Sequence, residues 1–163
     1  MLSRWSNDQT TTVFMATGRE WVGEREALEL WAPDGSHAFI IEHGAVLTPT
    51  GVIGLYALDL LSRKAELRVM LGANRGHGVG SWAVKELLRY AFIKLGLERV
   101  YLGTAAANTS AVWCFKTAGF QLEGCLRRDL LRDNMWYDNL RFGILRSEWE
   151  ARLKWETARA APA

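Results

Sequence analysis

A glycine-rich loop that runs straight into a helix constrains this chain more than any other feature. Residues 72–81 read Gly-Ala-Asn-Arg-Gly-His-Gly-Val-Gly-Ser, between a predicted strand over Lys64–Leu71 and an amphipathic helix predicted over Trp82–Leu95. Free N–H groups and the dipole at the start of such a helix attract anions, and glycines let the backbone approach a ligand closely. Strand, loop and helix together predict a phosphate-binding site.

Patterns of helix and strand alternate along the rest of the chain. Asn108 and Gly119 bracket a further helix, and Ser147 with Glu150 three residues later predicts a capped last helix. The other elements follow from apolar spacing and from β-branched or aromatic runs. The predicted helices are 2–15, 19–31, 82–95, 109–118 and one from 147; the predicted strands are 37–43, 51–61, 64–71, 99–104, 120–131 and 135–145; 47–51 is a predicted turn that holds Pro49.

This order of elements predicts an α/β domain of the α+β type. Its central sheet is mixed and mostly antiparallel, flanked by helices, with one parallel step around the strand–helix–strand unit. A chain of 163 residues with 49% hydrophobic and 23% charged residues is not disordered or collagen-like. We expect a single domain over residues 1–163, with a disordered tail over 159–163.

Composition also narrows the partners and the cellular setting. A net charge of +2 gives no argument for nucleic acid. Cys114 and Cys125 form neither a disulfide framework nor a zinc spacing, so we expect no metal. The sequence has no apolar run of membrane-spanning length and no signal-peptide pattern near its start. We therefore expect a cytoplasmic protein without a membrane partner.

Three phosphate-binding patterns can be compared with the loop. A Walker loop needs a Lys after its last glycine, and this loop has none. A Rossmann fingerprint needs a third glycine where Ser81 stands, and it does not follow a hairpin-like run of strands. The third pattern, R-x-x-G-x-G, is present as Arg75, Gly78 and Gly80. The alternative to all three is a turn that merely starts a helix.

A second segment makes the third pattern specific. Asn108 opens a predicted helix that ends in Gly119-Phe120 after a strand. The two segments together resemble the GNAT N-acetyltransferases. Glu123-Gly124-x-Leu126-Arg127, with Asp138 and a closing Ile144–Trp149 stretch, resembles the RimJ/RimL-type branch, and Trp5-Ser-Asn7-Asp8 is similar to a W-x-N-D stretch of some members. The resemblance implies a GNAT-like sheet and acetyl-CoA as the acetyl donor.

The chain departs from the family pattern in three places. Members usually have a strand before the W-x-N-D stretch, so the resemblance implies that this first strand is missing or that the chain starts late. Many members carry a Tyr that protonates the leaving thiolate where this chain has Phe115. The strand that leads into the loop lacks a common Pro and reads Leu71-Gly72-Ala73.

The resemblance also assigns roles to the loop and its surroundings. A backbone N–H at Met70 or Leu71 would stabilise the thioester oxygen as it gains negative charge. Asn108 would bind the pantetheine arm, or else only cap its helix, and Phe115 would lie near the cofactor. The remaining cofactor-binding candidates form the loop: Arg75, Gly76, His77, Gly78, Val79, Gly80 and Ser81, of which His77 could instead face solvent.

The catalytic candidates are a base and an acid. Bases of the family often lie on the strand before the loop, so the resemblance makes Glu66 the candidate base for the attacking amine; the alternative is that it pairs with Arg68 or faces solvent. Ser110 is a candidate acid or a helix cap, and Tyr137 is a third candidate, on a strand that borders the acceptor side in the family. A thiolate with a pKa near 8.5 can also leave without an acid.

The resemblance therefore implies direct attack of a primary amine on acetyl-CoA in a ternary complex. The acceptor would be a protein N-terminal α-amine or a small amine such as an amino sugar. One alternative is a non-catalytic acyl-CoA-binding module of the same fold, and a more distant one is a nucleotide-dependent oxidoreductase. A missing first strand would leave a sheet edge to cover, so a homodimer is plausible.

Overall fold

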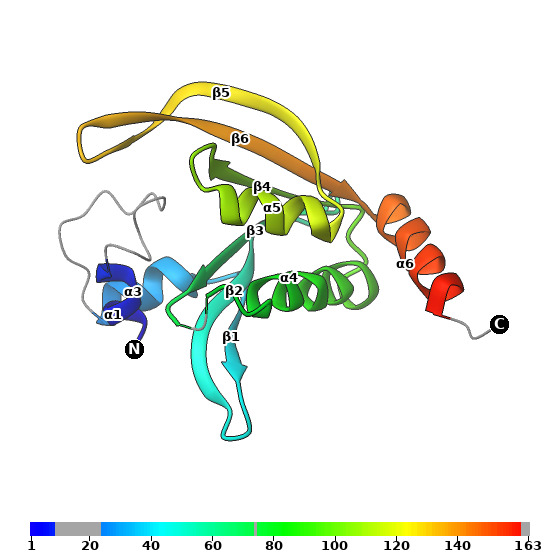
Figure 1. Cartoon of the computed structure of the whole chain (residues 1–163), viewed down its shortest axis with the longest axis horizontal. Helices are drawn as coiled ribbons and strands as arrows, with labels where there is room; N and C mark the ends of the chain where they lie inside the picture. The colour runs from blue at the N-terminus through cyan, green and yellow to red at the C-terminus, as the bar shows by residue number, and fades with distance from the viewer. Residues whose placement is uncertain (9–23, 74, 161–163) are drawn as a thin grey trace.

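The structure, a computed structural model, describes residues 1–8, 24–73 and 75–160 (Figure 1). Its elements in chain order are α1 (Leu2–Asn7), α3 (Glu24–Trp31), β1 (His37–His43), β2 (Thr48–Asp59), β3 (Lys64–Leu71), α4 (Val79–Arg89), the π-helical segment η1 (Tyr90–Lys94), β4 (Arg99–Ala105), α5 (Thr109–Ala118), β5 (Gln121–Arg132), β6 (Met135–Leu145) and α6 (Arg146–Ala160). The strands form one six-stranded sheet in the order β1-β2-β3-β4-β6-β5. This confirms the predicted mixed sheet flanked by helices.

The sheet is antiparallel everywhere except at its centre. There β3 and β4 run parallel, and they pair over three residues only, Lys64–Glu66 with Arg99–Tyr101. Beyond these pairs the two strands separate, while β4 continues to pair with β6 along its whole length. The sheet therefore opens between β3 and β4 at the end that leads into the glycine loop.

Apolar clusters on the two faces of the sheet hold the helices in place. On one face α4 packs against the sheet through Val84 and Leu88, η1 through Phe92 and α5 through Phe115, all buried. On the other face α1 and α3 contribute Trp5 and Trp31 to a smaller cluster. Figure 1 shows α1 and α3 on one side of the sheet and α4 on the other. Burial of these side chains is the main source of stability.

Several boundaries differ from the sequence predictions for local reasons. The turn predicted over Leu47–Gly51 is wrong, because β2 already begins at Thr48. Pro49 lies opposite Glu42, next to a break in the β1–β2 register, where a residue without an N–H is tolerated. The helix predicted from Trp82 begins three residues earlier, at Val79, so part of the glycine loop is helical.

The last helix also differs from its prediction. It begins at Arg146, and Glu148 accepts a hydrogen bond from the Leu145 N–H at 2.8 Å. Glu150 pairs with Arg146 instead, so the capping box predicted from Ser147 and Glu150 is wrong. Because α6 extends to Ala160, residues 159 and 160 do not belong to the expected disordered tail.

The N-terminal predictions are only partly covered by the structure. The helix predicted over residues 2–15 exists as α1 up to Asn7, and the one predicted over 19–31 exists as α3 from Glu24. The rest of both predictions lies outside the described residues. Before β1 the described residues form these helices and no strand. None of the described helices has the length and apolar character needed to cross a membrane.

Candidate active site

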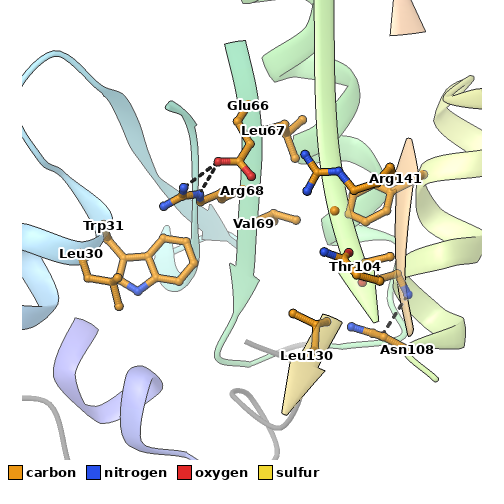
Figure 2. A pocket seen from close by; sticks show the side chains of 14 residues that line it. Leu30, Trp31, Glu66, Leu67, Arg68, Val69, Thr104, Asn108, Leu130 and Arg141 are labelled. Atoms are coloured by element: carbon orange, nitrogen blue, oxygen red, sulfur yellow. Dashed lines mark hydrogen bonds and ion pairs between the residues drawn. The ribbon is translucent and has the colours of Figure 1, made fainter. Parts of the chain in front are cut away.

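A cavity of about 400 Å³ occupies the opening between β3 and β4. Figure 2 shows Glu66 and Arg68 on β3 along one wall, with Arg141 on the opposite wall. The cavity is lined by Leu30, Trp31, Glu66, Leu67, Arg68, Val69, Gly103, Thr104, Asn108, Ala111, Phe115, Leu130, Asn139 and Arg141. Its size is typical of small-molecule sites.

The cavity passes through the sheet, so its two halves differ in chemistry. Successive side chains of a strand point to opposite faces, and residues paired across a ladder share a face. One half, which we call the α3-side half, is lined by Leu30, Trp31, Glu66, Arg68, Asn139 and Arg141. The other, the α5-side half, is lined by Leu67, Val69, Thr104, Asn108, Ala111 and Phe115. All ionisable lining residues in the described part of the chain lie in the α3-side half.

An ion pair forms the β3 wall of the α3-side half. The Arg68 Nε and Nη2 donate to Glu66 Oε2 at 2.9 and 2.6 Å. The Arg68 guanidinium also lies 4.9 Å from the centre of the Tyr56 ring. The predicted pairing of Glu66 with Arg68 is therefore present. Because both bonds end on Oε2, Oε1 has no hydrogen-bond partner among the described residues and can still take a proton from a ligand.

Tyr56 packs beneath this ion pair and is itself held by a hydrogen bond. Its hydroxyl donates to the Trp31 carbonyl at 2.7 Å, and this bond is buried. Burial raises the pKa of Tyr56 to about 12, although the charge of Arg68 acts in the opposite direction. Tyr56 is therefore a neutral hydrogen-bond donor, and it ties α3 to the sheet beside the cavity.

The opposite wall carries two polar side chains that the sequence did not indicate. Asn139 is buried, and its Nδ2 donates to Asp129 Oδ2 at 2.8 Å. Its Oδ1 is also buried and has no hydrogen-bond partner among the described residues. A Cβ at Gly103 would lie 2.9 Å from this oxygen and 2.7 Å from Arg141 Nη1, so the glycine makes room for both side chains.

The start of α4 has the geometry of an anion site at the edge of the opening. Gly78 precedes the helix with a φ of +78°, which favours glycine. The Trp82 N–H donates to the Gly78 carbonyl at 3.0 Å. The N–H groups of Val79, Gly80 and Ser81 precede this first helical bond and have no acceptor within the helix. They are the loop's strongest candidates for binding phosphate.

The other polar residues of the loop make contacts within the protein. Arg75 Nε and Nη2 donate to the Leu71 carbonyl at 3.0 and 2.9 Å, so this side chain closes the loop onto the end of β3. His77 is exposed, and its Nδ1 lies 2.9 Å from the Arg75 carbonyl oxygen. Ser81 Oγ lies 3.4 Å from Cys114 Sγ, and burial raises the pKa of the Cys114 thiol.

The hydrogen-bonding pattern of β3 shows which of the two candidate backbone donors, the N–H of Met70 or that of Leu71, points into the opening. Leu71 is opposite Gly51, and the Gly72 N–H donates to the Thr50 carbonyl at 2.8 Å. In an antiparallel ladder this pattern directs the backbone groups of Leu71 away from β2, and those of Met70 toward it. Leu71 and, two residues earlier, Val69 therefore direct their N–H groups into the opening. Val69 also lines the cavity.

Gly72 explains one departure from the family pattern. A Cβ at this position would overlap the Trp5 indole ring, which packs directly on the backbone. Trp5 is buried in the cluster that joins α1 to β2 and β3. The side chain of Trp5 therefore requires a glycine where the strand runs into the loop.

On α5 the structure brings only two of the predicted residues into the cavity. Asn108 Oδ1 accepts from the Ala111 N–H at 3.2 Å, so it caps the helix as the alternative reading required, and it also lines the cavity. Phe115 lines the cavity and packs against Phe120 and Phe142. Ser110 is exposed and does not line the cavity.

The hydroxyl group that lines the cavity belongs to Thr104, which the sequence did not indicate. Tyr137 on β6 does not line the cavity either. Thr104 does, and it is buried at the end of β4. A buried Thr in a short apolar strand has no local signal that separates it from a core residue. Among the described residues no group of three His, Cys, Asp or Glu side chains could hold a metal ion.

A mixed sheet that opens between parallel neighbours, with a glycine loop entering a helix beside the opening, defines the class of GNAT acetyltransferases, which use acetyl-CoA. The family model described as "Acetyltransferase (GNAT) domain" matches residues 1–121, and the chain belongs to this family.

Relatives of known name fall in the same family. Over 101 residues the chain is 34% identical to the putative ribosomal N-acetyltransferase YdaF of Bacillus subtilis; the match covers 61% of this chain and 55% of YdaF. Over 100 residues it is 28% identical to spermidine N(1)-acetyltransferase of Vibrio cholerae, covering 61% and 58%. The chain thus matches little more than half the length of these relatives.

Among solved structures, spermidine N-acetyltransferase from Vibrio cholerae in complex with CoA and spermine superposes with a TM-score of 0.82. The superposition covers 91% of this chain and 90% of that one, at 23% identity. At this identity the likeness shows the shared fold.

Proposed function

We propose that this protein is an acetyl-CoA-dependent N-acetyltransferase that moves an acetyl group to a primary amine by direct attack. The observation that carries the proposal is the cavity through the sheet, with the glycine loop at one side and charged side chains in its α3-side half. Membership of the GNAT family and relatives named for acetyl transfer to amines support it.

The cofactor would enter from the face of α4 and α5. Its pyrophosphate would accept hydrogen bonds from the N–H groups of Val79, Gly80 and Ser81, and Gly76 and Gly78 would let it approach the backbone. Its pantetheine arm would run between β3 and β4 past Asn108 and Phe115. Most of the α5-side half is apolar, which suits the arm and excludes water from the thioester.

The reaction joins the two halves of the cavity. The amine nitrogen attacks the thioester carbonyl carbon, the C–N bond forms, and the C–S bond breaks to release the CoA thiolate. Backbone N–H groups of Val69 and Leu71 would stabilise the developing oxyanion, and one such donor is typically worth about 3 kcal/mol. Glu66 Oε1 would accept the amine proton, directly or through water.

Protonation of the thiolate needs little help from the protein. Phe115 has no proton to donate, and Ser110 and Tyr137 do not line the cavity. Thr104 is the hydroxyl that does. A thiolate with a pKa of about 8.5 is a tolerable leaving group without an acid. We propose that it leaves as the anion or takes its proton through Thr104.

The finer assignments belong to the same proposal. Membership of the RimJ/RimL-like branch would be in line with the Trp5-Ser-Asn7-Asp8 and Glu123–Arg127 segments. The acceptor would be a protein N-terminal α-amine or a small amine, in line with the names of the ribosomal and spermidine acetyltransferase relatives. The whole chain would form one acetyltransferase domain, and it would associate as a homodimer.

Two measurements test the proposal. Acetyl-CoA at about 100 times its dissociation constant should add roughly 2.7 kcal/mol to the unfolding free energy and raise Tm by several degrees, whereas NAD should not. CoA release should then rise above background with at least one amine of a broad panel. Stabilisation without turnover would instead indicate a non-catalytic acyl-CoA-binding module, the alternative that Phe115 favours. No stabilisation would contradict both.

A further inference from the structure

The α3-side half of the cavity has an excess of positive charge. Among the described residues, its ionisable lining side chains are one acid, Glu66, and two arginines, Arg68 and Arg141. The Glu66 carboxylate is already bonded to Arg68. Asp129 lies behind Asn139 and accepts a hydrogen bond from it. A polyamine would therefore meet a wall with one carboxylate that is already paired and a guanidinium that repels it.

Arg141 is the charged side chain in this half that could bind an anionic ligand. It forms no ion pair within the described part of the chain, and its guanidinium lies 6.0 Å from the centre of the Tyr101 ring. The charge of Arg141 helps to lower the pKa of the nearby Glu123 carboxylate. That carboxylate accepts its two hydrogen bonds from Arg99, however, and not from Arg141. Figure 2 shows Arg141 facing the opening from β6. A planar guanidinium in this position suits a carboxylate or phosphate.

Asn139 supplies the second recognition element, two residues from Arg141 on the same face of β6. Its Oδ1 is buried beside Gly103 and has no hydrogen-bond partner in the described structure. Buried acceptors are normally satisfied, so this oxygen indicates a donor that comes from a ligand. An amine N–H is such a donor, and it would lie next to the oxyanion site of Arg141.

We propose that the α3-side half selects an amine acceptor that also carries an oxyanion, which Arg141 binds while Asn139 Oδ1 accepts a hydrogen bond from the amine. The proposal rests on the acetyltransferase function and names its substrate class. A carboxylate or a phosphate close to the amine would satisfy both groups. The apolar side chains of Leu30 and Trp31 would cover the rest of the acceptor.

The test compares amines with and without the anionic group. kcat/KM would be measured by CoA release for leucine against 3-methylbutylamine and for phosphoethanolamine against ethanolamine, with spermidine as the cationic acceptor. Because these amines differ in basicity, the decisive quantity is the change that each variant causes in the ratio within a pair. The variants are Arg141→Gln, Arg141→Lys and the control Arg127→Gln, an exposed arginine of β5 that does not line the cavity.

We expect Arg141→Gln to lower kcat/KM for the preferred anionic amine by about tenfold or more, and to leave its neutral counterpart within about twofold. Arg141→Lys should restore part of the loss, and Arg127→Gln should change neither. The pair that responds identifies the oxyanion as carboxylate or phosphate. Equal losses for both members of each pair, or spermidine as the best acceptor of the wild type, would overturn the inference and leave the acetyltransferase function standing. If none of the amines is acetylated, the proposed function itself is overturned.

Discussion

At the scale of single residues, the cavity depends on two side chains that are each held through one of their two polar atoms. Glu66 is held by Arg68 through one oxygen, and Asn139 by Asp129 through its Nδ2. In both cases the second polar atom of the side chain has no hydrogen-bond partner among the described residues. A carboxylate or amide fixed at one atom presents the other in a defined direction, which is the preorganisation that a catalytic or binding group needs.

Glu66→Gln tests the base. An amine with a pKa of about 10.4 loses its proton at pH 7 at a cost of roughly 4.6 kcal/mol, so removal of the base should lower kcat by about 100-fold or more. Acetyl-CoA affinity should not change. The matched control is Glu98→Gln, because Glu98 also pairs with an arginine, Arg63, and does not line the cavity. An unaltered kcat in Glu66→Gln would mean that Glu66 serves only as the partner of Arg68.

Tyr56→Phe tests the bond that holds α3 on the sheet. Loss of the hydroxyl leaves the buried Trp31 carbonyl without its donor, and we expect the free energy of unfolding at neutral pH to fall by about 1 kcal/mol. Chemical denaturation measures this change. A variant as stable as the wild type would show that this hydrogen bond contributes nothing.

The same pair of proteins makes a prediction at alkaline pH. The folded-state pKa of Tyr56, about 12, lies above the ordinary value of 10.0. For an acid with a raised pKa, the stabilisation is fully present below the unfolded pKa and is lost as pH rises toward the folded one. The wild type should therefore lose stability between pH 10 and 12 relative to Tyr56→Phe. Parallel curves for the two proteins over this range would contradict the burial of the phenol.

At the scale of secondary structure, the start of α4 links backbone conformation to cofactor binding. Gly78 adopts φ +78° directly before the helix, and Gly44, in the turn between β1 and β2, adopts φ +85°. A Cβ would meet nothing within 4 Å at either position. Alanine at either glycine therefore costs conformational strain without a steric clash, and only the loop glycine lies beside the proposed phosphate site.

Gly78→Ala should weaken acetyl-CoA binding, whereas Gly44→Ala should not. Both should lower the unfolding free energy by about 1–2 kcal/mol, because alanine disfavours the left-handed region. Isothermal titration with acetyl-CoA and denaturant unfolding measure the two effects separately. Equal affinity in the two variants would indicate that the loop conformation does not serve the cofactor.

At the scale of the whole molecule, the hairpin of β5 and β6 runs along one edge of the fold (Figure 1). Several of its apolar side chains are exposed to solvent. Met135 and Trp136 near its tip are 57% and 55% exposed. Leu131 pairs with Trp136 across the hairpin, so these two exposed side chains lie together on one face. Clustered apolar surface of this kind is typical of an interface. The hairpin therefore offers a surface for the proposed homodimer.

Light scattering should give twice the mass of one chain at micromolar concentration. Trp136→Ser should shift the protein toward the monomer, because it removes a large apolar side chain from the hairpin tip. Trp155→Ser, at a similarly exposed tryptophan of α6, is the control and should leave the mass unchanged. A monomeric wild type would contradict the dimer, and an unaffected Trp136→Ser dimer would place the interface elsewhere.

Much of the fold and part of the site could be predicted because their signals are local. The strands His37–His43 and Lys64–Leu71 have the predicted bounds, and α5 has the predicted Asn108 cap and a left-handed Gly119. Such signals lie within a few residues of the feature that they specify. The glycine loop is of the same kind, since the sequence alone indicates a helix N-terminus that can bind an anion.

The cavity itself was decided by tertiary structure. β3 and β4 separate after Glu66 and Tyr101, and this opening depends on pairing between strands that are distant along the chain. The same pairing places Arg141 and Asn139 on the wall opposite Glu66 and leaves Ser110 and Tyr137 outside the cavity. The sequence determined which local elements form and where an anion can bind. Only packing across the sheet determined which polar side chains meet, because no pattern within one strand specifies its partners across the opening.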